Sequence, residues 1–298
     1  MPFLELSLVI RIEQQPRVEA ALEDLGALSI TLRDADAETP DEQAIFEPGV
    51  GELPLWPTIT LNALFDEHTD RRGLAEALGE LLPWLEPAQL QFRDVADQDW
   101  VRAWMDQYQP MPFGRRLWIY PWNIEPPQDP DLVVVRLDPG LAFGSGTHPT
   151  TALCLEWLDG LDLAGRTLTD FGCGSGILAI AALKLGARSA VCVDIDAQAL
   201  LAARSNAELN GVSAALETQG TAAPLAPADC VLANILAGPL LELEPTLARA
   251  CRPGADLVLS GLLAAQAPEV AAAYRANFAI VSVLDRDDWS CILARKVR

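Results

Sequence analysis

Three glycines at alternate positions mark the segment Asp170–Gly176, whose sequence is Asp-Phe-Gly-Cys-Gly-Ser-Gly. Glycines at a tight turn let the backbone approach a ligand closely, and the helix predicted to begin at Ile177 offers unpaired N–H groups there. The spacing is G-x-G-x-G, whereas the dinucleotide fingerprint places its third glycine one residue later. The loop is therefore predicted to contact a ligand without cradling a pyrophosphate. A purely structural glycine turn is the alternative.

Two aspartates, Asp194 and Asp196, lie at the carboxyl end of the next predicted strand, which spans 189–194. A carboxylate at the carboxyl end of such a strand can accept both hydroxyls of a ribose that lies across the sheet edge. Asp196 immediately precedes a predicted helix and suits its N-cap. Asp194 is therefore the predicted ribose ligand.

Asn234 directly follows the strand predicted at 230–233 and is itself followed by Ile-Leu-Ala. A polar residue at this end of a strand, beside the switch point of the sheet, faces the ligand crevice. Its amide could accept a hydrogen bond from an amine and aim the nitrogen lone pair at an electrophilic methyl, which is positioning rather than base catalysis. A cap of the next turn is the alternative role. Asp229 lies ~16 Å away at ~3.3 Å per strand residue and is predicted to be structural.

The segment Asp138–Thr151 carries three glycines and three threonines at the entrance of a predicted helix. This composition predicts a polar surface over the cofactor pocket, with Pro149 in the first helical turn and Thr151 facing the Gly172 loop. His148 could orient a substrate or cap the helix.

From residue 149 onward, helices and strands alternate with short connections. The helices are predicted at 149–158, 177–185, 197–210, 238–250 and 264–277, and the strands at 167–171, 189–194, 230–233 and 256–260. Such alternation predicts a doubly wound parallel sheet. Two final strands, at 278–284 and 289–296, are separated only by a turn and must pair antiparallel. A doubly wound sheet that ends in a hairpin is typical of class I methyltransferases.

The first third of the chain follows a different pattern. Strands at 3–10, 27–32, 58–65 and 89–93, with helices at 16–25 and 70–82, predict a ferredoxin-like α+β module whose sheet has one free face. A short strand at 44–47 is predicted inside a long acidic loop. A helix over 97–109 would place Trp100, Trp104 and Tyr108 on one stripe, as a packing seam between domains or as a substrate contact. Strands at 115–122 and 132–137 resemble a hairpin.

Charge and composition exclude several classes of function. The 298 residues carry a net charge of −21, and residues 1–110 hold 22 acidic against 7 basic side chains. Such a field repels nucleic acid and anionic lipid and favours a basic protein partner, although acidity alone also serves solubility. Without an apolar run of ~18 residues or a signal peptide, the protein is expected to be cytoplasmic and not membrane-bound. Six scattered cysteines and two histidines predict buried thiols and no metal site.

Together, the segments 138–151, 170–176, 194–196 and 234–237 closely resemble the PrmA family, the S-adenosylmethionine-dependent methyltransferases of large-subunit ribosomal protein L11. The resemblance spans nearly the whole chain, and the G-x-G-T-H-P-T-T segment joined to N-I-L-A is its most specific part. It implies methylation of lysine ε-amino groups and of the N-terminal α-amino group of this basic substrate. It also implies an N-terminal substrate-recognition domain at 1–95, a linker helix at 96–112 and an S-adenosylmethionine-binding domain at 113–298, in a chain expected to act as a monomer.

Carried over by position, the resemblance assigns roles to individual residues. Thr151 and Asn234 would flank the incoming amine and contact the cofactor together with Gly172 and Asp194. Gly174 and Gly176 would shape the cofactor loop. Many class I enzymes place an acidic residue near adenine, but this chain has none around 219–221, so no residue is assigned to adenine.

Three alternatives remain open at this point. A class I methyltransferase acting on RNA is disfavoured because lysine occurs only at 184 and 296; one acting on another protein is not excluded. An NAD-dependent oxidoreductase is disfavoured by the glycine spacing and the terminal hairpin. A binding module without activity is disfavoured by the presence of Asn234 and Thr151.

Overall fold

The computed structural model describes residues 2–37, 39, 55–95, 109–138, 144 and 146–297. The chain divides into two compact units, Met1–Ala103 and Trp104–Arg298. The strand predicted at 44–47 and the aromatic stripe predicted on the linker helix at 96–112 lie outside the described residues. The end of that predicted helix is described, and it includes the start of a strand at Met111.

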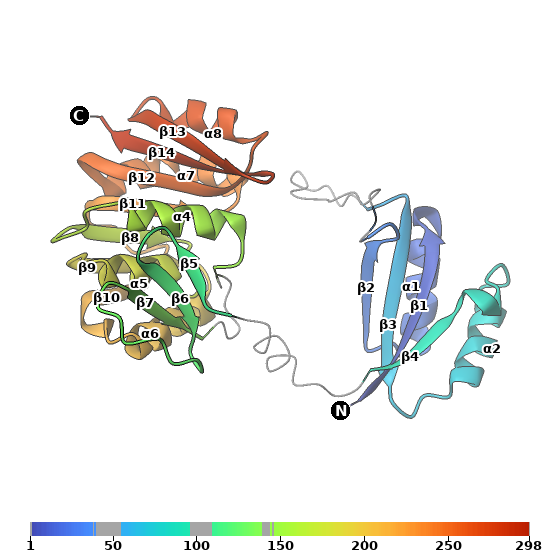
Figure 1. The fold of residues 1–298 in the computed structure, drawn as a ribbon. Coiled ribbons are helices and arrows are strands. Elements are labelled where there is room, and N and C mark those ends of the chain that lie inside the picture. The colour runs from blue at the N-terminus through green and yellow to red at the C-terminus, as the bar shows by residue number, and fades with distance from the viewer. Residues whose placement is uncertain are drawn as a thin grey trace. The chain divides into compact units, whose positions relative to one another are not determined.

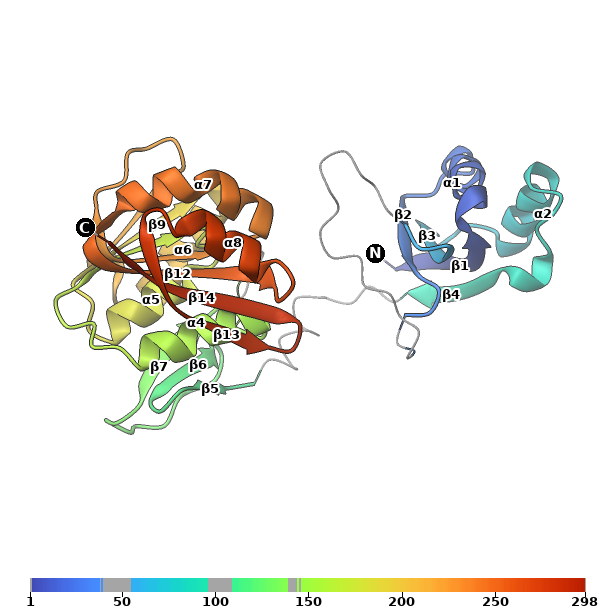
Figure 2. The ribbon, with the colours of Figure 1, turned by 90° about the horizontal axis from the view of Figure 1, so that it is seen from above.

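The first unit is a four-stranded sheet covered by two helices on one face, as Figure 2 shows. Its elements in chain order are β1 (Phe3–Arg11), α1 (Gln15–Asp24), β2 (Ser29–Asp34), β3 (Thr58–Asp66), α2 (Arg71–Leu81) and β4 (Gln91–Val95). The sheet order is β2-β3-β1-β4, with every pair antiparallel. Because side chains alternate along a strand, β1 buries Leu4, Leu6, Leu8 and Ile10 against the helices. Asp70 caps α2 by accepting from two backbone N–H groups.

The second unit is built on a seven-stranded sheet (Figure 1). Its strands are β8 (Thr167–Phe171), β9 (Ser189–Asp194), β10 (Leu216–Gly220), β11 (Ala228–Asn234), β12 (Cys251–Leu263), β13 (Phe278–Arg286) and β14 (Trp289–Lys296). Their order is β10-β9-β8-β11-β12-β14-β13. The first five strands are parallel, and β14 pairs antiparallel with both β12 and β13. This mixed sheet fits the class I methyltransferase fold.

Helices cover both faces of the large sheet. They are α4 (Pro149–Asp159), α5 (Ile177–Lys184) and α6 (Ala197–Leu209) on one face, and α7 (Ala237–Ala250) and α8 (Ala267–Tyr274) on the other. The helix and strand positions predicted from the alternating pattern are confirmed to within a few residues. Strand β10 was not predicted, because only Leu216 among its five residues is buried and its apolar alternation is weak.

The predicted hairpin of strands 115–122 and 132–137 is wrong. The structure has β5 (Met111–Phe113), β6 (Leu117–Pro121) and β7 (Val133–Leu137), and β6 pairs with β7 in parallel. The proline-rich segment between β6 and β7 brings the chain back beside the first residue of β6. Strand β7 therefore runs in the same direction as β6. The hairpin is instead formed by β5 and β6, which pair antiparallel around a turn at Gly114, where φ is +77°.

This small sheet explains why α5 is apolar on all sides. Its strands pack on α4, α5 and α6 opposite the large sheet, so these helices are covered on two faces (Figure 2). Every residue of α5 from Ile177 to Leu183 is buried, as a helix without a polar face must be. All six cysteines are buried free thiols, as predicted. Among the described helices, none is long and apolar enough to cross a membrane.

Candidate functional site

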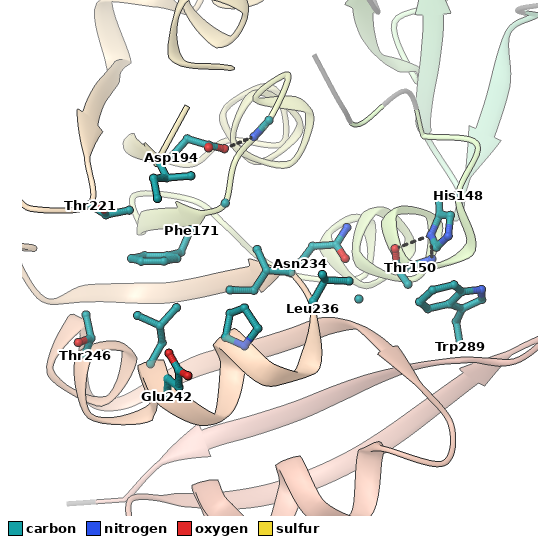
Figure 3. Close-up of a pocket in the computed structure, with 17 residues that line it drawn as sticks. His148, Thr150, Phe171, Asp194, Thr221, Asn234, Leu236, Glu242, Thr246 and Trp289 are labelled. Atoms are coloured by element: carbon teal, nitrogen blue, oxygen red, sulfur yellow. Dashed lines mark hydrogen bonds between the residues drawn. The ribbon is translucent and has the colours of Figure 1, made fainter. Parts of the chain in front are cut away.

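A cavity of about 760 Å³ opens at the carboxyl ends of β8, β9 and β11 (Figure 3). Ligand crevices of doubly wound sheets occupy this position. Its described lining residues are His148, Thr150, Phe171, Gly172, Gly174, Asp194, Ile195, Thr221, Asn234, Ile235, Leu236, Pro239, Glu242, Leu243, Thr246, Gly261 and Trp289. Gly172, Gly174, Asp194 and Asn234, which the sequence proposed for the site, therefore line one cavity.

The glycine loop joins β8 to α5 and is anchored on the neighbouring strand. The N–H groups of Gly172 and Cys173 both donate to the carbonyl of Val193, at 2.8 and 3.1 Å. Gly172 has a φ of +75°, and a Cβ there would lie 2.2 Å from Cγ2 of Ile235. Glycine is therefore required at 172 for both conformation and space. Gly176 begins α5, and a Cβ on it would lie 2.9 Å from Cβ of Ala203. Gly176 thus packs on α6 and is not among the described lining residues.

The carboxylate of Asp194 faces the cavity and is held by two backbone groups. Its Oδ2 accepts from the N–H of Gly174 at 2.9 Å, and its Oδ1 accepts from the N–H of Asp196 at 3.0 Å. Each carboxylate oxygen can accept further hydrogen bonds, so a ligand diol can still be bound. Asp196 caps α6 through the N–H of Gln198 at 2.8 Å, as the sequence predicted.

Asn234 lies at the end of β11 and is linked to the first turn of α4. Its Nδ2 donates to Oγ1 of Thr151 at 3.2 Å, which leaves the amide oxygen to serve as an acceptor at the cavity. Thr151 is 1% exposed and lies behind Asn234, while the adjacent Thr150 lines the cavity. Thr151 therefore contacts the site through Asn234.

His148 caps α4 and stands at one end of the cavity. Its Nδ1 accepts from the N–H of Thr150 at 3.3 Å, which is the helix-capping role that the sequence left open. Its ring makes an edge-to-face contact with Trp289 at a centroid distance of 4.6 Å (Figure 3). Partial burial lowers the pKa of His148, so the neutral ring is favoured at physiological pH.

Asp170 is a fully buried carboxyl group beneath the glycine loop. Its Oδ2 accepts from the N–H of Ala179 at 3.1 Å, and its Oδ1 has no hydrogen-bond partner within the described part of the chain. Burial, with a smaller contribution from the nearby charge of Asp194, raises the pKa of Asp170 to about 7. Asp170 is therefore protonated in a large fraction of molecules at neutral pH.

Asp229 has the structural role that the sequence predicted. Its carboxylate accepts from the N–H and hydroxyl of Thr167 and pairs with Arg252 at 2.6 Å. Burial opposes ionisation of Asp229, but these donors outweigh it and lower its pKa to about 2.

The apolar part of the lining is what sequence reasoning missed. Ile195 and Leu236 are exposed at 89% and 53% although both are large apolar side chains. Ile195 directly follows Asp194, and Leu236 lies two residues after Asn234, so their closeness to predicted site residues was an available signal. Trp289 and Glu242 carry no such signal, because only the fold brings β14 and α7 to the cavity.

Comparison with known proteins gives consistent matches along the chain. A family model described as ribosomal protein L11 methyltransferase (PrmA) matches residues 2–297. A protein of Azotobacter vinelandii named ribosomal protein L11 methyltransferase is 53% identical over 97% of each chain, and a protein of the same name from Pseudomonas aeruginosa is 52% identical over 99% of each. The crystal structure of a ribosomal protein L11 methylase from Lactobacillus delbrueckii subsp. bulgaricus is 34% identical. It superposes with a TM-score of 0.58 and covers 64% of this chain and 100% of that one.

Proposed function

This chain belongs to the ribosomal protein L11 methyltransferase (PrmA) family, and on that premise we propose that it transfers methyl groups from S-adenosylmethionine to ribosomal protein L11. The acceptors are lysine ε-amino groups and the N-terminal α-amino group. The cavity beside the glycine loop is the proposed site of transfer.

The observation that best supports this proposal is the arrangement of Asn234. Because Nδ2 donates to Thr151 at 3.2 Å, the amide oxygen is left to accept from an amine. An acceptor oxygen at the end of β11 suits an incoming N–H group, whereas a phosphate or carboxylate substrate would require donors. Asn234 and Thr151 are thus the proposed positioning pair for the methyl acceptor.

The volume and the polar lining of the cavity support binding of S-adenosylmethionine. Its volume of about 760 Å³ lies within the roughly 300–1,000 Å³ of small-molecule sites. We assign the ribose diol to the carboxylate of Asp194 and the close backbone contacts to Gly172 and Gly174. Gly176 supports the loop by packing against Ala203 of α6. The apolar side chain of Ile195, exposed next to Asp194, offers a surface for a purine ring.

When bound, S-adenosylmethionine supplies an electrophilic methyl group on a positively charged sulfur. The protein must then align a neutral amine with that methyl, because the nitrogen lone pair forms the new bond. The titratable residues among the described lining are His148, Asp194 and Glu242. His148 uses Nδ1 to cap α4, and Asp194 accepts from two backbone N–H groups. We assign amine deprotonation to solvent before binding, aided by the apolar lining, which lowers the pKa of a buried amine.

We assign substrate recognition to the first unit as a ferredoxin-like domain. Its sheet order β2-β3-β1-β4, with both helices on one face, supports this classification. Residues 1–110 carry 22 acidic and 7 basic side chains, which suits a basic ribosomal protein. Described exposed carboxylates lie on its helices, at Glu23 and Asp24 of α1 and at Glu76 and Glu80 of α2.

The proposal is tested by incubating the full chain with radiolabelled S-adenosylmethionine and either purified L11 or ribosomal RNA. Label on L11 and none on RNA is expected. Transfer to RNA, or calorimetric binding of NAD in place of S-adenosylmethionine, would contradict the proposal.

A further inference from the structure

One buried amide on α6 joins the glycine loop, which lines the cavity, to the end of β7. Asn206 is 2% exposed. Its Oδ1 accepts from the N–H of Asp138 at 3.1 Å, and its Nδ2 donates to the carbonyl of Asp138 at 3.4 Å and to that of Ser175 at 3.0 Å. The amide thus links the end of β7 to the glycine loop.

The same glycine loop is held at two further points. The hydroxyl of Ser175, which is fully buried, donates to the carbonyl of Gly144 at 2.6 Å. Gly176 packs against Ala203, with only 2.9 Å between Cβ of Ala203 and the position of a glycine Cβ. Ala203 and Asn206 are three residues apart and share one face of α6. Helix α6 is therefore the platform on which the loop rests.

An apolar side chain could fill the space of Asn206, but it would remove the hydrogen bonds that Asn206 makes to three backbone groups. Buried polar groups that are fully satisfied hold a single geometry, and losing the shared partner is costly for each of them. The amide therefore fixes where the glycine loop lies relative to the end of β7. A ligand that depends on close contact with the loop backbone benefits from a loop that is already in place.

We infer that Asn206 is a positioning residue of the cofactor site, which holds the glycine loop and the end of β7 in the geometry that binds S-adenosylmethionine. The inference rests on the proposed function. It assigns no contact between Asn206 and the methyl acceptor, so its loss acts on cofactor affinity and leaves the rate of transfer from the bound cofactor unchanged.

The chain supplies a matched control one turn later, at the C-cap of α6. Asn210 accepts from the N–H of Arg136 at 2.8 Å and donates to the carbonyls of Arg136 and Asn206, at 2.6 and 2.8 Å. It therefore makes as many backbone hydrogen bonds as Asn206, but none to the glycine loop. A purely structural role predicts similar behaviour for Asn206→Ala and Asn210→Ala.

The test measures the Kd and KM for S-adenosylmethionine, kcat with L11, and the melting temperature in the full-length protein. Asn206→Ala is expected to raise Kd and KM about tenfold, an affinity change of about 1.4 kcal/mol, with kcat at saturating cofactor within about twofold of wild type. Asn206→Ser, whose hydroxyl can satisfy one of the three groups, is a milder variant that keeps the test open if the alanine variant does not fold. Asn210→Ala is expected to lower the melting temperature without changing Kd.

Unchanged affinity in a folded Asn206 variant would overturn the inference, as would an equal loss of affinity in Asn210→Ala. Failure of the wild-type protein to bind S-adenosylmethionine would instead refute the proposed function, and the inference with it.

Discussion

Asp194 is the side chain on which cofactor affinity depends most directly in this account. Replacing it by asparagine removes the charge but keeps one oxygen that can accept from the N–H of Gly174. Charged hydrogen bonds contribute about 1.5–3 kcal/mol, so Asp194→Asn is expected to weaken S-adenosylmethionine binding about 10- to 100-fold. Calorimetric titration measures this loss, with circular dichroism as the control for folding. Wild-type affinity in the variant would refute the ribose assignment.

Asp170 gives the protein a specific dependence of stability on pH. Its pKa is about 7 in the folded protein and about 3.9 when unfolded. At pH values between these two pKa values, the folded state binds more protons than the unfolded state. The contribution of Asp170 to the free energy of unfolding therefore decreases as the pH rises through this window. Relative to Asp170→Asn, the free energy of unfolding of the wild type should fall by about 1.4 kcal/mol per pH unit across the window.

Urea unfolding of both proteins at several pH values between 4 and 8 checks this prediction. The comparison cancels other titrating groups, such as Asp229, whose lowered pKa has the opposite effect on stability. Parallel pH profiles for the two proteins would show that Asp170 is ionised in the folded state.

The sequence predicts a site residue correctly where its side chain lies at the carboxyl end of a predicted strand. Asp194, Asn234 and the glycine loop line the cavity because parallel strands bring their carboxyl ends to one edge. The sequence selected Thr151 for the site, whereas Thr150 lines the cavity, because a rotation of α4 by one residue exchanges the two side chains. The placement of Trp289 depends on tertiary pairing and has no local signal.

At the scale of elements, the glycine loop connects β8 to α5 and cannot tolerate a side chain at its first glycine. A Cβ on Gly172 would lie 2.2 Å from Cγ2 of Ile235, whereas one on Gly165, at the similar φ of +72°, meets nothing within 4 Å. Both alanine variants should lose about 1–2 kcal/mol through the left-handed backbone conformation. Only Gly172→Ala should also displace Ile235 and reduce cofactor affinity by about tenfold or more.

Thermal melting and cofactor titration of the two variants separate these effects. Equal cofactor affinity in Gly165→Ala and Gly172→Ala would show that the loop is a structural turn alone.

Most helices and strands could be predicted because the spacing of apolar residues and the residues that begin or end helices agree. Helix α6, which Asp196 caps, is an example. The parallel pairing of β6 and β7 was not, because a proline-rich connection is compatible with either a reversal or a return crossing. The choice is made by burial: β7 packs on α5 and α6, and Val135 and Leu137 are fully buried. Such contacts between distant segments have no counterpart in local sequence.

At the scale of the whole molecule, charge is distributed unevenly along the chain. Residues 1–110 carry most of the net charge of −21, whereas cofactor binding is assigned to the second unit. Salt screens the attraction between an acidic surface and a basic partner over about 10 Å at 0.1 M. The KM for L11 should therefore rise several-fold between low and moderate salt while the Kd for S-adenosylmethionine changes little. Equal salt dependence of the two constants would assign the acidity to solubility.

The proposed role of Asn234 is to orient an amine of L11 for methyl transfer. It is tested most directly by mass spectrometry of L11 after reaction with trideuteromethyl S-adenosylmethionine and either wild-type or Asn234→Ala protein. Labelled lysine ε-amino and N-terminal α-amino groups are expected with the wild type. With the variant, transfer should be slowed about 100-fold at saturating cofactor, as expected for a misplaced acceptor. Unchanged transfer by the variant, or label on atoms other than amino nitrogens, would contradict this role.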